Sequence, residues 1–236
     1  MSQIPLGLTL DTGASLDTFI ADGNELAVAA VRDLRTPGAM LDGPAGSGRS
    51  HLLQAFATAR PAAYAALAEV GAPAALAGFE RQPAVVLDDI DVVLGSLAWE
   101  RALFAIVERV VAANGVVVVA ATRGARHLDF ALPDLGSRLA ALTAFRLQPL
   151  DDEGKLAALG LRIRARGLTA DRQALRYLIQ RTHRDMPSLT RLVDALDRQS
   201  WETGRRLTVP FIRAYLDGVS GESPESPRRT PPSMPQ

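Results

Sequence analysis

Short apolar segments alternate with amphipathic segments over the first part of the chain. Four segments are apolar and short enough to be buried strands: 39–42, 62–67, 84–87 and 116–121. Helices are expected where apolar or alanine residues recur at helical spacing: 24–35, 50–60, 73–79 and 99–114. Asn114 and Gly115, which tolerate a left-handed backbone, are expected to end the last of these helices. This alternation predicts an α/β domain with a parallel sheet over residues 13–149.

The pattern changes after Pro149, where helical spacing dominates. Helices are expected at 152–166, 169–182, 187–203 and 210–216, with a short strand or turn at 207–209. Acidic residues open the first of these helices and Gly167 follows it, which is the usual order of helix start and stop signals. Residues 150–218 are therefore predicted to form a small all-helical domain.

The two ends of the chain lie outside this pattern. Residues 1–12 are apolar but contain Pro5 and Gly7, so we expect an extended arm there and no helix. Residues 219–236 are rich in proline and serine, and we expect a disordered tail.

Composition excludes several classes of protein. Hydrophobic residues make up 47% of the 236 residues, which excludes disorder for most of the chain, and the lack of cysteine excludes a disulfide scaffold and a thiol nucleophile. Basic and acidic residues number 26 each, so the surface is not expected to bind DNA tightly without regard to sequence. No apolar run reaches the roughly 20 residues of a membrane span and no secretory signal is apparent. We expect a cytoplasmic protein without a membrane partner.

A glycine-rich segment, GPAGSGRS at residues 43–50, lies between the first expected strand and the helix that follows. It matches a P-loop, in which glycines let backbone N–H groups point into one concavity and the helix start adds its positive end. A glycine-rich turn without a ligand is the alternative. The residues expected to bind a nucleotide are Gly43, Ala45, Gly46, Ser47, Gly48, Arg49, Ser50 and His51.

Two residues of this loop carry separate chemistry. The Ser50 hydroxyl is placed to ligate Mg²⁺. Arg49 stands where lysine is usual, and its planar guanidinium cannot deliver the same compact charge to the phosphates. Lys155 is the only lysine among the 26 basic residues, so an arginine-rich composition is one explanation for Arg49.

Acidic and polar residues follow two of the expected strands. Asp88 and Asp89 come directly after 84–87, at the end of a buried parallel strand, where α/β sheets bind ligands. We expect Asp88 to hold Mg²⁺ through water and Asp89 to orient or activate an attacking water. Thr122 follows 116–121, where it either senses a γ-phosphate or forms a turn.

Four segments, 43–53, 85–91, 132–139 and 207–216, resemble the DnaA-related AAA+ family in their order and spacing. The likeness covers residues 3–217 and is strongest to the Hda branch, the regulatory inactivators of the replication initiator DnaA. Its specific parts are the string LPDLGSRL at 132–139 and the ending RSHLL of the P-loop; members of this branch share an arginine at the position of Arg49.

The resemblance implies a P-loop AAA+ domain followed by a lid domain, with ADP or ATP and Mg²⁺ bound and ADP favoured. Arg138 matches the arginine finger, which acts in trans on a nucleotide held by a neighbouring protein. Phe19 and Asn24 lie where the family packs around adenine. DnaA and the DNA polymerase sliding clamp are the implied partners, with DNA reached through the clamp; a homo-oligomer is a further option.

The clamp contact is implied for the segment QIPLGL at residues 3–8. A glutamine amide at Gln3 would enter a polar subpocket, and Leu6 and Leu8 would anchor in an apolar groove. A packed N-terminal strand is the alternative interpretation of this segment.

Two departures from the family pattern affect the expected activity. The second sensor arginine of the family falls on Pro187, and Arg184 is shifted from it by three positions, so ATP hydrolysis by this chain is expected to be weak at most. The chain ends in a proline-rich segment where DnaA continues into a basic helix-turn-helix domain, so we do not expect origin DNA to be read in that way.

The function expected from these features is prevention of re-initiation, through stimulation of ATP hydrolysis by DnaA together with the DNA-loaded clamp. One alternative is an autonomous AAA+ ATPase of the helicase-loader type acting on single-stranded DNA, against which the aromatic content of 5% counts. Another is a binding module that has lost nucleotide exchange.

Overall fold

The computed structural model describes residues 14–182, 185–200 and 206–221 of the chain. Its first half contains a five-stranded parallel sheet in the order β2-β3-β4-β1-β5. The strands are β1 (Gly38–Asp42), β2 (Ala63–Ala66), β3 (Ala84–Asp88), β4 (Val116–Ala121) and β5 (Thr143–Arg146). The structure confirms the four expected strands. It adds β5, which the apolar pattern did not indicate because this edge strand is largely exposed.

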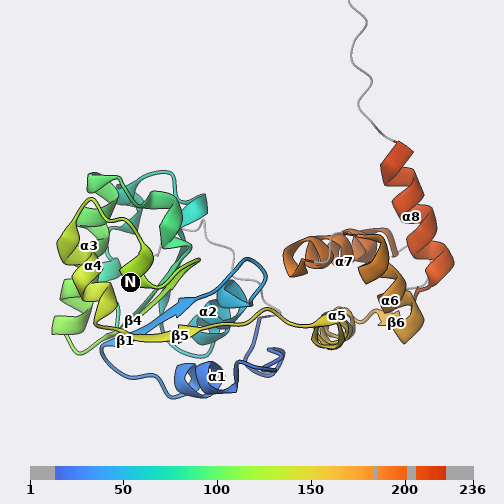
Figure 1. The fold of residues 1–236 in the computed structure, drawn as a ribbon, viewed down its shortest axis with the longest axis horizontal. Coiled ribbons are helices and arrows are strands. Elements are labelled where there is room, and N and C mark those ends of the chain that lie inside the picture. Colours follow the sequence, from blue (N-terminus) through green and yellow to red (C-terminus); the bar gives the residue numbers. More distant parts are fainter. Residues whose placement is uncertain (1–13, 183–184, 201–205, 222–236) are drawn as a thin grey trace, which may run out of the picture.

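Four helices and several single-turn 3₁₀ segments cover the sheet (Figure 1). The helices are α1 (Glu25–Arg32), α2 (Arg49–Thr58), α3 (Leu97–Ala112) and α4 (Pro133–Ala140). Side chains of α1 and α2 pack on one face, against Leu41 and Val118, while α3 and α4 pack on the other, against Met40 and Val119. Alternate residues of each strand therefore enter different cores, as the pleat requires, so each central strand is buried on both faces.

The helix expected at 73–79 is the main error within this half. The segment instead forms two 3₁₀ turns, η2 (Pro73–Leu76) and η3 (Phe79–Arg81). Gly78 separates them with a left-handed φ of 96°, which interrupts a continuous helix. The remaining 3₁₀ turns are η1 (Leu67–Glu69), η4 (Ile90–Val93) and η5 (Ala125–His127).

The second half of the described chain is a helical lid domain with its own core. Its helices are α5 (Asp152–Ala165), α6 (Arg172–Arg181), α7 (Met186–Ser200) and α8 (Val209–Gly221). A two-residue parallel pair joins β6 (Thr169–Ala170) to β7 (Arg206–Leu207), so the expected all-helical domain contains a short strand pair. The helix expected from Thr169 starts later because the Asp171 side chain caps α6 by accepting a hydrogen bond from the Ala174 N–H. At the other end, α8 continues to Gly221, past the expected start of the tail at 219.

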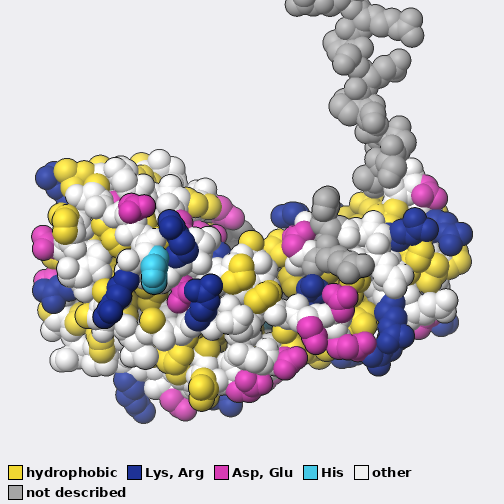
Figure 2. All heavy atoms as spheres, viewed as in Figure 1, with side chains coloured by type: hydrophobic (Ala, Val, Ile, Leu, Met, Phe, Trp, Pro, Cys, Tyr) yellow, Lys and Arg dark blue, Asp and Glu magenta, His cyan; other side chains and the backbone are white. Residues whose placement is uncertain are grey.

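The lid lies beside the α/β half and is reached through residues 147–151 (Figure 1). Basic and acidic side chains are interspersed over the visible face of both halves (Figure 2), in keeping with the balanced composition. In the parts of the chain that the structure describes, no helix has both the length and the apolar character needed to cross a membrane. The expected clamp-binding residues Gln3, Leu6 and Leu8 lie outside the described residues.

A buried carboxylate fixes the start of α4. Glu100 of α3 is fully buried, and its side chain accepts hydrogen bonds from the N–H groups of Gly95 at 2.7 Å, Ala131 at 3.1 Å and Leu132 at 2.6 Å. Close packing continues within the helix, because a Cβ on Gly136 would lie 2.8 Å from the Phe130 ring. The orientation of α4, which carries Arg138, therefore depends on contacts with α3 and with the preceding loop.

We expect Glu100→Ala to lower the free energy of unfolding by about 1–3 kcal/mol, because it removes the charged acceptor of three backbone N–H groups. Urea denaturation followed by circular dichroism measures this change. Glu69→Ala, which removes an exposed carboxylate, is the matched control and should have almost no effect. Equal stability of the two variants would contradict the proposed anchoring.

Candidate functional site

A cavity of about 750 Å³ lies between the α/β half and the lid. Seven of the residues expected to bind a nucleotide line it: Phe19, Gly46, Ser47, Gly48, Arg49, Ser50 and His51. The lid closes the opposite side with residues of α5 and α7. The cavity therefore has two walls, the P-loop segment and the lid. The sequence motif indicated only the first of them.

The loop before α2 has the backbone of a phosphate cradle. Gly46 and Gly48 have left-handed φ values of 79° and 92°, and Gly48 is the N-terminal cap residue of α2. A Cβ on Gly48 would lie 2.8 Å from the Phe19 ring, and one on Gly43 would lie 2.6 Å from the Leu147 carbonyl oxygen. The loop thus requires glycine for both its conformation and its close packing, and it points the positive end of α2 into the cavity.

Two buried polar atoms in the cradle lack a hydrogen-bond partner within the described chain. They are the Ser47 Oγ atom and the Nη1 atom of Arg49, whose side chain is only 9% exposed. The other terminal nitrogen, Nη2, donates to Asp89 Oδ1 at 3.4 Å. Buried polar groups are normally paired, so a buried hydroxyl and a buried guanidinium nitrogen beside a glycine-rich loop fit an anionic ligand such as a phosphate group.

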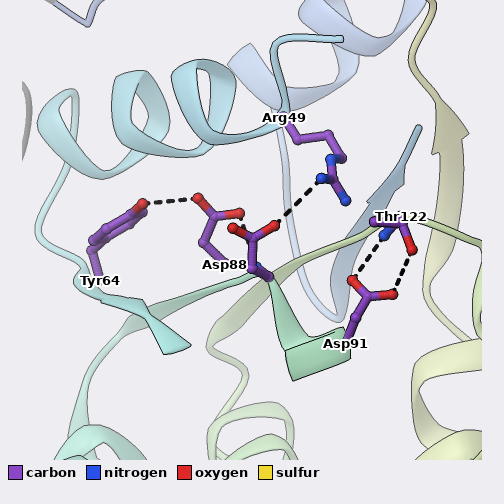
Figure 3. Close-up of polar contacts among 6 residues, drawn as sticks. Arg49, Tyr64, Asp88, Asp91 and Thr122 are labelled. Atoms are coloured by element: carbon purple, nitrogen blue, oxygen red, sulfur yellow. Dashed lines mark hydrogen bonds and ion pairs between the residues drawn. The ribbon is translucent and has the colours of Figure 1, made fainter. Parts of the chain in front are cut away.

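Asp88 ends β3 with both carboxylate oxygens occupied (Figure 3). Oδ2 accepts a hydrogen bond from the Tyr64 hydroxyl at 2.9 Å, and Oδ1 accepts one from the Asp89 N–H at 3.0 Å. Burial, reinforced by the Asp88 charge, raises the pKa of the Tyr64 phenol, so Tyr64 remains a donor. Tyr64 was not predicted as a site residue, because the partner of Asp88 lies on another strand.

The expected Mg²⁺ ligands are not equally placed. Ser50 lines the cavity, whereas Asp88 is almost completely buried and does not line it. Within the described ranges there is no group of three or more His, Cys, Asp or Glu side chains that could hold a metal ion. A Mg²⁺ ion at this loop would therefore need ligand phosphate oxygens and water in addition to Ser50, which is its common mode of binding beside nucleotides.

Asp89 adopts a left-handed backbone, with φ of 52°, and its carboxylate forms an ion pair with Arg49. Burial is the main reason that the pKa of Asp89 is raised, and the Asp88 charge adds to this effect, while Arg49 opposes it. A raised pKa suits a carboxylate that accepts a proton from water. In this structure, however, Asp89 is paired with the guanidinium of its own P-loop.

Thr122 follows β4 and is held by a second acidic residue (Figure 3). The Thr122 N–H and hydroxyl donate to the two carboxylate oxygens of Asp91 at 2.8 and 2.7 Å. Thr122 does not line the cavity, and its hydroxyl is already engaged. Asp91 was another residue that sequence reasoning missed; its only signal is that it follows Asp88 and Asp89 closely.

The expected adenine-binding residues separate into two places. Phe19 lines the cavity and meets His51 edge-to-face, with ring centroids 5.5 Å apart. Asn24 does not line the cavity, and neither do Gly43 and Ala45 of the loop. The Asn24 side-chain amide instead binds the backbone of Gln148, donating to its carbonyl at 3.0 Å and accepting from its N–H at 2.8 Å.

Arg138 lies on the outer surface of α4. Its side chain is 56% exposed and forms an ion pair with Glu108 of α3, and it does not line the cavity of its own chain. On the lid side, Pro187 at the start of α7 approaches the loop, since a Cβ on Gly46 would lie 3.4 Å from its Cδ atom. Arg184 lies outside the described residues.

Comparison with known proteins agrees with this architecture. Residues 152–216 match the family model of the Hda lid domain. An uncharacterised protein of Haemophilus influenzae is 34% identical over 227 residues, covering 91% of this chain and 98% of that protein. Domain III of the replication initiation protein DnaA from Thermotoga maritima superposes with a TM-score of 0.72 at 16% identity, covering 89% and 98% of the two chains. AMPPCP-bound DnaA from Aquifex aeolicus superposes with a TM-score of 0.65 at 18% identity, covering 90% and 71%.

The two DnaA structures establish the AAA+ fold alone. Their sequence identity to this chain is too low to support a statement about function. The lid match assigns residues 152–216 to the Hda lid family, and the relative from Haemophilus influenzae spans nearly the whole chain. The chain therefore belongs to the same family as that protein, and it combines the AAA+ fold of DnaA with a lid domain of the Hda lid family.

Proposed function

We propose that this chain is a nucleotide-bound regulator that stimulates ATP hydrolysis by DnaA and thereby prevents re-initiation of replication. The observation that carries the proposal is the contrast between two arginines. Arg49 is buried in the phosphate cradle of its own chain, whereas Arg138 is exposed on α4, away from the cavity. One arginine is thus available to a ligand within the chain and the other to a partner.

The nucleotide acts as a scaffold in this proposal. The Ser47 hydroxyl and the Arg49 nitrogen, which have no partner in the part of the chain that the structure describes, bind its phosphates together with the N-terminal end of α2, and Phe19 contacts its base. Bound nucleotide would fill the space between the P-loop and the lid and so fix the orientation of α5 and α7. ADP is favoured over ATP, because the groups that would act on a γ-phosphate are already engaged.

Because these groups are engaged, we expect the chain itself to hydrolyse ATP weakly at most. Asp89 is paired with Arg49, and Thr122 donates both of its hydrogen bonds to Asp91. To act on a γ-phosphate, each group would first have to break a contact within its own protein. The chain therefore supplies a catalytic group to DnaA and leaves its own nucleotide intact.

Arg138 is the group supplied in trans. A guanidinium presented by a neighbour stabilises the charge that develops on the transferring phosphoryl group, and its rigidity and planar donors suit that task. Arg138 would exchange Glu108 for the nucleotide of DnaA on docking. The buried Glu100 supports this role by holding the start of α4 against α3.

In this proposal, binding to the sliding clamp places the chain close to replicated DNA. Gln3 would place its amide in a polar subpocket and Leu6 and Leu8 would fill an apolar groove of the clamp, which brings Arg138 to DnaA near replicated DNA. Docking through a short N-terminal segment would leave the α4 surface available to DnaA.

We expect Gly48→Ala to abolish ADP binding, because its Cβ would collide with Phe19 and the left-handed backbone would be strained. Isothermal titration calorimetry with purified chain, cleared of bound nucleotide, measures the affinity. Gly71→Ala is the matched control, since a Cβ there meets no atom within 4 Å, and it should bind as the wild type does. Undiminished ADP binding by folded Gly48→Ala would contradict the assignment of the cradle.

For the arginine in trans, we expect Arg138→Ala to reduce the stimulated rate of ATP hydrolysis by DnaA by about 10³-fold, or to the basal rate if that is reached first. The assay contains ATP-loaded DnaA and DNA-loaded clamp, and phosphate release is followed with time. Arg101→Ala removes an exposed arginine from α3 and should leave stimulation unchanged. Full stimulation by Arg138→Ala would reject the proposal, and rapid ATP turnover by the isolated wild-type chain would favour the autonomous ATPase.

The clamp contact has an independent test. The double variant Gln3→Ala/Leu6→Ala should lose binding to immobilised sliding clamp while it retains ADP affinity, because the changed side chains lie far along the sequence from the cradle. Surface plasmon resonance gives both the loss and its size. If the double variant bound the clamp as well as the wild type does, the assignment of the N-terminal segment as the clamp-binding site would be wrong.

A further inference from the structure

The neutral charge of the whole chain conceals a difference between its two halves. Residues 150–218, which form the lid, contain 13 basic and 9 acidic residues and so have a net charge of +4. Residues 13–149 contain 11 basic and 14 acidic residues, a net charge of −3. A basic domain beside an acidic one indicates a polyanionic partner for the basic domain. The contact with that partner requires cations on the lid surface that carboxylates of the chain do not neutralise.

Helix α6 presents such cations. Its sequence, RQALRYLIQR, contains three arginines and no acidic residue. Its exposed polar side chains are those of Arg172, Gln173, Arg176, Gln180 and Arg181. Arg172 and Arg181 are about 14 Å apart along the helix axis, which is the rise of about four base pairs of duplex DNA. Arginine and glutamine side chains are also groups that donate hydrogen bonds to phosphate and sugar oxygens of DNA.

One carboxylate faces two of these arginines and is shared between them. Glu153 of α5 forms an ion pair with Arg172 and a second with Arg176, the latter at 3.4 Å between Nη2 and Oε1. The three side chains are each more than half exposed, so both ion pairs are weak. Two guanidinium groups against one carboxylate leave a net positive charge at this end of α6.

Tyr177 joins the other end of α6 to α8 and brings in a fourth arginine. The Arg213 Nε–H donates to the Tyr177 hydroxyl at 3.4 Å, and the Cζ atoms of Arg181 and Arg213 lie 5.5 and 5.7 Å from the centre of the Tyr177 ring. Cation–π contacts of this kind hold two guanidinium groups beside one ring without neutralising them. Tyr177 is the main cause of the raised pKa of Arg213, and the charge of Asp217, one turn farther along α8, contributes least.

This surface lacks the apolar side chains of a membrane-binding helix. Among the described residues, the large apolar side chains that are exposed are Leu26, Val92 and Leu97, all in the α/β half. A helix that enters a bilayer surface needs apolar residues beside its basic ones, so the phosphates of DNA fit this face better than lipid does. Helices α6 and α8 form the end of the lid farther from the α/β half (Figure 1), so DNA bound there would leave Arg138 accessible.

We propose that the exposed face of α6 and α8, formed by Arg172, Arg176, Arg181 and Arg213, binds the phosphate backbone of duplex DNA weakly and without regard to sequence. Four arginines against the shared Glu153 provide charge for about three phosphate contacts. The inference goes beyond the proposed function, because it gives the chain a direct contact with DNA in addition to the one through the clamp. The acidic α/β half keeps this contact weak, in line with the neutral charge of the whole chain.

The test is fluorescence anisotropy of a labelled duplex of about 20 base pairs, titrated with the full chain alone. We expect the affinity of the wild type to fall about 40-fold between 50 and 200 mM NaCl, which is the salt dependence of about three phosphate contacts. Arg181→Ala/Arg213→Ala should bind more weakly at the lower salt concentration. Its affinity should fall only about fourfold over the same range, because about one contact remains.

Two further double variants complete the experiment. Arg172→Ala/Arg176→Ala leaves the contacts of Tyr177 in place, and its affinity should fall about 12-fold over the same range, the dependence of about two contacts. Arg101→Ala/Arg126→Ala removes two exposed arginines from the α/β half and is the matched control. This control should bind DNA as the wild type does.

The salt dependence distinguishes a contact with phosphate from a structural role. If both lid variants keep the affinity and salt dependence of the wild type, the inference is overturned. Weaker binding with unchanged salt dependence would also overturn it, because the arginines would then only support the fold of the lid. Wild-type binding to phosphatidylserine vesicles or to polyglutamate, with none to duplex DNA, would overturn the choice of DNA. The assay contains no DnaA, clamp or nucleotide, so its failure would leave the proposed function intact, and failure to stimulate DnaA would leave a DNA contact intact.

Discussion

The structure depends on the phosphate cradle that joins β1 to α2. Glycines in left-handed conformations and the amino end of α2 meet at one point between the sheet and the lid. Two buried polar atoms that have no hydrogen-bond partner among the described residues lie at the same point. Each of these features costs free energy in the isolated chain, through backbone restriction or desolvation. An anionic ligand at this point would satisfy the polar atoms, and the lid wall of α5 and α7 would then close over it.

Around the cradle, the two side chains expected to act on a γ-phosphate are engaged by other residues of the chain, whereas the expected arginine finger is exposed. Asp89 is paired with Arg49, and Thr122 is held by Asp91, whereas Arg138 lies on the surface of α4. This division is what the proposed function requires, namely a P-loop protein that keeps its own nucleotide and acts on that of a partner. The contacts of Glu100 and Gly136 set the orientation of α4 and therefore the position of Arg138.

Much of the fold follows from local patterns, whereas the contacts of the site do not. Buried strands and the P-loop were predictable because a short apolar run and a glycine-rich turn carry their own signals. The edge strand β5 escaped because its residues are exposed, and Thr169 was assigned to a helix because the cap at Asp171 was overlooked. The contact of Asn24 with Gln148 was not predictable because the two residues are distant in sequence, and Tyr64 was missed for the same reason.

The central claim is that the nucleotide of this chain stays intact while the nucleotide of DnaA is hydrolysed. A labelling experiment tests it directly. In one arrangement DnaA carries ATP labelled at the γ-phosphate and this chain carries unlabelled nucleotide; in the other the labels are exchanged. With DNA-loaded clamp present, the account predicts rapid release of labelled phosphate in the first arrangement and negligible release in the second. Rapid release in the second arrangement, with none in the first, would contradict it.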